Sequence, residues 1–124
     1  MSEQGAGPKP AAGATELLSA ARFQEELRRV ARFGSRVLVG DPLAAAVRKI
    51  TQNPAFTQSR LLARMLAALT YQKGEFRRAE VAAFDSATLA MVISLMDAYA
   101  AGSSPREEWI GAVNEVQAAL LGVQ

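Results

Sequence analysis

The chain has 124 residues, of which 50% are hydrophobic, 6% are aromatic and 21% are charged, and its net charge is +2. This length fits a single domain with a core of its own. The sequence contains neither cysteine nor histidine, which excludes disulfide bonds, a thiolate nucleophile, a cysteine-based metal site and an imidazole base. We therefore expect no enzymatic activity, no cofactor and no metal ion.

Residues 1–14 are rich in Gly, Ala and Pro and carry one charge of each sign. We expect a flexible N-terminal tail here, followed by a helical domain over residues 15–122. The tail lacks the apolar stretch of a signal peptide, and the longest apolar run, residues 87–96, is half the length of a membrane span. These features predict a cytoplasmic protein without a membrane anchor.

The first helix is predicted over residues 16–33, with Thr15 as N-cap and Gly34 as its end. Apolar residues recur on one face of this helix, and arginines and glutamates occupy the other. The apolar face consists of Leu17, Ala20, Phe23, Leu27, Val30 and Ala31. Residues 35–40 have strand character but no predicted partner strand, so we expect an extended linker.

Two further helices are predicted from start signals and apolar stripes. Asp41-Pro42 combines an N-cap with a proline at the first helical position, and predicts a helix to about Gln52. After Asn53-Pro54, Ser59 is a second possible cap for a helix that runs to about Lys73 and ends at Gly74. Its apolar stripe consists of Leu62, Met65, Leu66 and Leu69.

Residues 71–79 resemble the turn between the helices of a tetratricopeptide repeat, where a Gly, an aromatic residue and an Ala recur at this spacing. No second copy occurs in the sequence, so we do not transfer the family's peptide-binding function. We expect a plain helical hairpin, whose second helix covers residues 76–84. Whether this helix continues into the next one, to residue 101, stays open.

The last two predicted helices cover residues 86–101, capped by Asp85 or Ser86, and residues 105–121. Ser104 precedes Glu107 by three residues, with Pro105 between them, which is the pattern of a capping box. Five or six helices of these lengths predict an all-α fold, an irregular helical bundle in a single domain.

Charge is distributed unevenly along the chain. Residues 22–78 contain twelve Lys or Arg and four acids, whereas residues 79–124 contain six acids and one Arg. The two halves could neutralise each other within the fold or between subunits, or the basic half could bind nucleic acid or an acidic partner.

Residues 42–70 resemble a helix-turn-helix, although the turn is longer than usual and lacks the central Gly. The resemblance implies that the first turn of the second helix enters the major groove of DNA. Gln58, Ser59 and Arg60 would then contact base edges, while Arg48, Lys49 and Arg64 would contact phosphates. In the alternative interpretation, Arg60 and Arg64 form the solvated side of an amphipathic helix.

Four large side chains are candidate anchors of a protein interface: Met65, Met91, Met96 and Trp109. Each could instead fill the core. Our leading hypothesis is a non-enzymatic helical interaction domain, with an accessory or regulatory role, that forms a homodimer or binds another protein. The alternative is a DNA-binding transcriptional regulator that uses residues 42–70.

Overall fold

The computed structural model describes residues 15–31 and 40–122. In chain order, the elements are β1 (Leu17–Ser19), α2 (Ala20–Ala31), α3 (Pro42–Gln52), α4 (Thr57–Tyr71), β2 (Glu75–Arg77), the 3-10 helix η1 (Arg78–Ala83), α5 (Ser86–Ala101) and α6 (Arg106–Leu121). This single, predominantly helical domain confirms the predicted all-α bundle. The predicted tail, Gly34 and residues 35–39 of the predicted linker lie outside the described residues.

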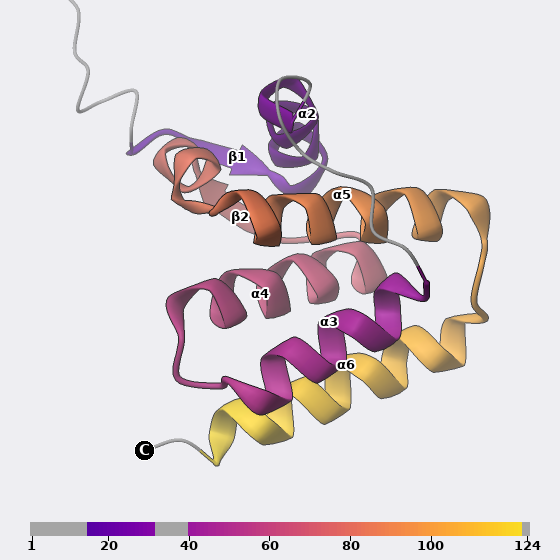
Figure 1. The fold of residues 1–124 in the computed structure, drawn as a ribbon. Coiled ribbons are helices and arrows are strands. Elements are labelled where there is room, and N and C mark those ends of the chain that lie inside the picture. Colours follow the sequence, from indigo (N-terminus) through magenta and orange to yellow (C-terminus); the bar gives the residue numbers. More distant parts are fainter. Residues whose placement is uncertain (1–14, 32–39, 123–124) are drawn as a thin grey trace, which may run out of the picture.

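Helices α3 to α6 form the body of the domain. Figure 1 shows α3 in front of α4, with α5 above this pair and α6 below it. Both α5 and α6 contact α3 and α4, and α2 packs on α5. Helices α3 and α6 run in the same direction, so their first turns lie at one end of the bundle (Figure 1).

One hydrophobic core joins all of these elements. The fully buried large apolar side chains are Phe23, Leu27, Ile50, Leu62, Met65, Leu66, Val92, Leu95, Val113 and Val116. The predicted stripe of α4 is confirmed, since all four of its side chains are buried. Phe23 of α2 stacks on Phe76 of β2 with 4.2 Å between ring centroids. This contact holds α2 against the segment 71–79 that was predicted as a helical hairpin.

The small sheet corrects two sequence predictions. Residues 17–19 pair antiparallel with residues 75–77, and the buried Leu18 and Phe76 lie opposite each other. The first helix therefore begins at Ala20, and the Ser19 hydroxyl, in place of Thr15, accepts a hydrogen bond from the backbone N–H of Arg22. Because the strand turns alternate side chains outward, Leu17 is 61% exposed.

The predicted helical hairpin at residues 71–79 is also wrong. Helix α4 ends at Tyr71, and the chain then passes through the left-handed Gln72, at φ 57°, and through Gly74, at φ 142°. These two conformations reverse the chain into β2 instead of starting a helix. Within the predicted helix 76–84, only residues 78–83 are helical and form η1, so residues 76–101 do not form one helix.

The predicted N-caps are confirmed at two helices, α3 and α5. Asp41 Oδ1 accepts hydrogen bonds from the backbone N–H groups of Leu43 and Ala44, and Asp85 Oδ1 accepts one from Thr88. The capping box at Ser104 is absent, because α6 begins after Pro105 with no side-chain cap. The start of α6 is fixed differently: the guanidinium of Arg106 donates to the carbonyl of Thr70, at 2.7 Å.

Candidate functional site

A groove of about 580 Å³ lies between α3 and α6. From α3 and its cap, the lining residues are Asp41, Leu43, Ala44, Val47, Arg48 and Thr51; from α6, they are Glu108, Gly111, Ala112 and Glu115. Their spacing in each helix, three or four residues, places them along one face. The groove therefore follows the line along which the two helices pack.

The floor of this α3–α6 groove is apolar and thin. Ala44, Gly111 and Ala112 contribute little or no side chain, and Val47 is only partly buried. Apart from the adjoining residues and backbone of α6 itself, a Cβ added to Gly111 would meet no atom within 4 Å. A third helix could therefore approach this floor closely, as small residues allow in helix packing.

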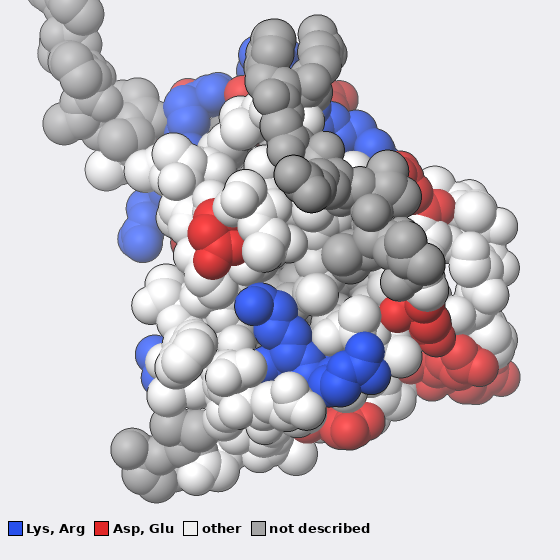
Figure 2. Space-filling model, in the orientation of Figure 1, with Lys and Arg blue, Asp and Glu red and all other residues white. Residues whose placement is uncertain are grey.

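The rims of the groove carry opposite charges. Arg48 is the basic residue of the α3 side, and Glu108 and Glu115 are the acidic residues of the α6 side. Figure 2 shows basic side chains grouped over α3, with acidic side chains to their right and below. No ion pair involves these three residues within the described part of the chain. The Asp41 carboxylate, in contrast, is used as the cap of α3.

The residues predicted to contact DNA do not form one surface. Ser59 is 1% exposed and lies inside α4 rather than at its cap. The Gln58 amide donates to the carbonyl of Ala83 and accepts from the N–H of Asp85. Since the segment that ends η1 folds against the first turn of α4, neither side chain is presented to a DNA groove, and this part of the prediction is wrong.

Arg64 is also engaged within the fold. Its guanidinium pairs with Glu80, donates to the carbonyl of Glu75 and lies 4.6 Å above the centre of the Phe76 ring. Of the six candidates, Arg48, Lys49 and Arg60 make no ion pair with another described residue. Only Arg48 lines the groove.

Three of the four predicted interface anchors belong to the core. Met65, Met96 and Trp109 are at most 3% exposed, and Met91 is partly buried against the same cluster. The Trp109 ring packs edge-on against Tyr99, with 5.2 Å between centroids. Sequence reasoning missed the large apolar side chains that are exposed: Leu17, Val30, Phe56, Tyr71 and Leu121.

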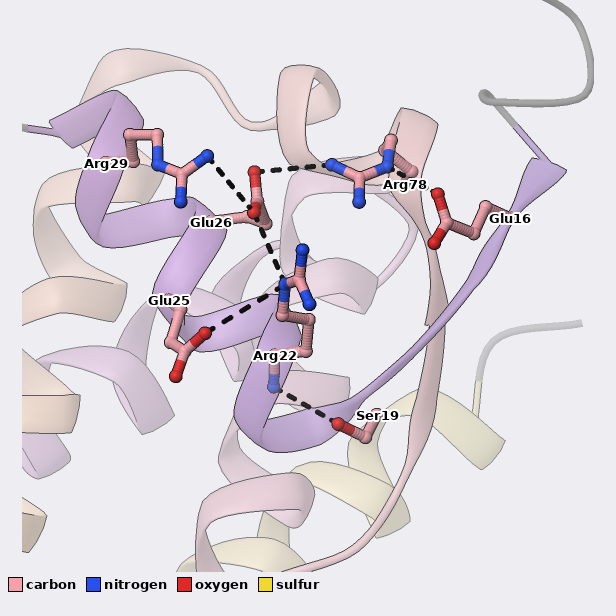
Figure 3. A network of polar contacts seen from close by, with 7 residues as sticks. All are labelled: Glu16, Ser19, Arg22, Glu25, Glu26, Arg29 and Arg78. Carbon is pink, nitrogen blue, oxygen red and sulfur yellow. Dashed lines mark hydrogen bonds and ion pairs between the residues drawn. The ribbon is translucent and has the colours of Figure 1, made fainter.

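A buried carboxylate organises the charges around α2 (Figure 3). Glu26, 7% exposed, lies within 3.5 Å of guanidinium groups of Arg22, Arg29 and Arg78. Its Oε2 accepts no hydrogen bond and depends on the ion pairs with Arg22 and Arg29. Arg78 also binds Glu16, at 2.9 Å, and this hydrogen bond lowers the pKa of the Glu16 carboxyl. Basic and acidic groups balance here, so the cluster holds α2, β1 and η1 together.

Two ion pairs join the basic and acidic halves of the sequence: Arg28 with Asp97, at 2.9 Å, and Arg64 with Glu80. The halves thus neutralise each other in part within the fold, while the rims of the α3–α6 groove stay outside this pairing.

Within residues 15–31 and 40–122, no group of three or more acidic residues is placed to hold a metal ion. No helix in these ranges is both long and apolar enough to cross a membrane. The chain matches no protein-family model, no curated protein and no solved structure.

Proposed function

We propose that the protein is a non-catalytic helical interaction domain, and that the α3–α6 groove is its contact surface. One observation carries this proposal: an exposed apolar floor lies between charged rims whose side chains form no ion pair with other described residues. An apolar centre with a polar rim is the usual anatomy of a protein interface. Arg48, Glu108 and Glu115 are therefore available to a partner.

Site-specific photo-cross-linking tests the proposal. A photoreactive benzoyl amino acid replaces the exposed Ala44 in the groove, or, as a control, the exposed Glu25 on α2. We expect a discrete covalent adduct between this protein and its partner only when the photoreactive residue stands at position 44. The substitution Gly111→Arg, which fills the groove, should abolish the adduct, whereas Gln117→Arg, on α6 but outside the groove, should preserve it. No adduct, or equal labelling from positions 44 and 25, would contradict the proposal.

DNA binding is the second candidate function, and the charges of α3 favour it. Helix α3 carries Arg48 and Lys49 and no acid, and Arg60 is exposed in the first turn of α4. Phosphate contacts from these residues would make the affinity for duplex DNA fall steeply with salt. Arg60→Ala should then reduce the slope of log affinity against log salt by about 1. Lys73→Ala, which removes an exposed cation two residues beyond the other end of α4, serves as the control.

A further inference from the structure

The charges that line the α3–α6 groove differ between its two walls. Asp41 and Arg48 lie on the α3 wall, where the Asp41 carboxylate caps its own helix, and Glu108 and Glu115 lie on the α6 wall. A partner that matches the remaining charges must present an acidic group to Arg48 and a basic group to the two glutamates. The chain itself carries such groups, side by side.

The direction of the helices fixes the level of each charge. Because α3 and α6 run in the same direction (Figure 1), Glu108 lies near the end of the groove where α3 begins. Counted from the first residue of its own helix at 1.5 Å per residue, Arg48 lies about 9 Å along α3, which is within the range of about 3 to 14 Å that Glu108 and Glu115 span along α6.

A two-fold axis can relate two facing copies of such a groove in two ways. An axis that crosses the groove would place α3 on α3 and α6 on α6, with like charges opposed. An axis that runs along the groove places α3 of each copy on α6 of the other, at the same level. Only the second arrangement brings Arg48 of each copy towards the glutamates of the other, while the Asp41 carboxylates stay engaged as helix caps.

We infer that the α3–α6 groove binds a second copy of this chain, with the two-fold axis along the groove and α3 of each copy against α6 of the other. This inference rests on the proposed function, for which it names the partner. Arg48 of each copy meets the glutamates of the other copy's α6, so the ion pairs form twice. Ala44, Gly111 and Ala112 allow the helices to approach.

Charge reversal with light scattering tests this arrangement. We expect the wild-type chain to be a dimer whose dissociation constant rises at least tenfold in Arg48→Glu and in Glu115→Arg. The double variant Arg48→Glu/Glu115→Arg should regain the wild-type value, because both pairs are reversed together. Arg60→Glu and Glu25→Arg make the same charge changes outside the groove and should leave the dimer intact. Far-UV circular dichroism verifies that each variant is folded.

An equimolar mixture of the two single variants tests whether the ion pairs form between copies. In the two-fold dimer, the mixed pair places a glutamate at position 48 against an arginine at position 115 at one contact and keeps the wild-type Arg48 and Glu115 at the other, so the mixture should dimerise although neither variant does so alone. A mixture that stays monomeric would overturn the two-fold arrangement, and a dimer insensitive to either reversal would overturn the groove as its interface. A wild-type chain that stays monomeric at every concentration would overturn the inference. In that case, an adduct from position 44 to a different protein would still support the proposed function.

Discussion

The buried carboxylate of Glu26 has little contact with water, and its charge is stabilised by three guanidinium groups. Glu26→Gln removes the charge that attracts them, and we expect a loss of about 1–3 kcal/mol in the free energy of unfolding. The arginines are partly exposed and can rehydrate, which keeps the loss moderate. Glu25→Gln, one residue earlier and 71% exposed, should change stability by less than about 0.5 kcal/mol. Urea unfolding of both variants measures the difference, and equal losses would contradict this role of Glu26.

Gly111 occupies the interior of α6 with open space around its Cα. Gly111→Ala should raise the free energy of unfolding of the monomer by about 0.5–1 kcal/mol, because alanine restricts the unfolded chain and favours the helix. Gly102 provides the contrast: it caps α5 in the left-handed region, at φ 67°. Gly102→Ala should therefore lower stability. Thermal unfolding in dilute solution distinguishes the two signs, and destabilisation by Gly111→Ala would show that the groove floor is less open than described.

Glu80 gives the fold a dependence on pH. Burial alone would raise the pKa of its carboxyl, but hydrogen bonds from the Arg64 guanidinium and the backbone N–H of Arg77 outweigh it and hold the pKa below the ordinary value. A lowered pKa contributes stability that is complete at neutral pH and is lost as the pH falls below about 4.5.

The stability gap between wild type and Glu80→Gln should therefore shrink from pH 7 to pH 3. Urea midpoints measured at several pH values follow this gap. Arg64→Ala should also reduce the pH dependence, because it removes the donor. A gap that stays constant down to pH 3 would contradict the assignment.

Among the elements, the last residue of η1 is attached to the first turn of α4 by one amide. Gln58 donates to Ala83 at 2.7 Å and accepts from Asp85 at 2.9 Å, which aligns the N-cap of α5. Gln58→Ala should lower the free energy of unfolding by about 1–2 kcal/mol, since two hydrogen bonds are lost. Gln52→Ala, at an exposed position in the last turn of α3, should have little effect. Chemical denaturation compares the two, and equal effects would mean that water replaces the Gln58 amide without cost.

Elements with local start signals were predictable from sequence. Asp41-Pro42 determines where α3 begins because the cap and the proline act within three residues. The strands were missed because Leu17–Ser19 gains its partner only through Glu75–Arg77, far along the chain. Locally, Leu17 and Ala20 fit a helical period as well as they fit a strand. The long-range pairing decides between the two.

At the scale of the whole molecule, a stripe of apolar residues does not reveal which of its members stay exposed. Met65 and Trp109 were interface candidates, and both are buried by helices distant in sequence. The groove itself could not be found from the sequence, because α3 and α6 become neighbours only in the folded chain. Arg48 was selected for its charge alone, and it lines the groove.

The pairing of β1 with β2 also has a consequence for the order of folding. The pairing closes a loop of about 55 residues but forms a ladder of only three residue pairs. The entropy lost on closing the loop is therefore large relative to the free energy that the ladder contributes. We expect β1 to join last and to open first, by sub-global unfolding that leaves α3–α6 assembled. Native-state hydrogen exchange should show the Leu18 and Phe76 amides exchanging through a lower-energy opening than those of Leu62 to Leu66. Equal exchange energies would mean that the domain unfolds as a single cooperative unit.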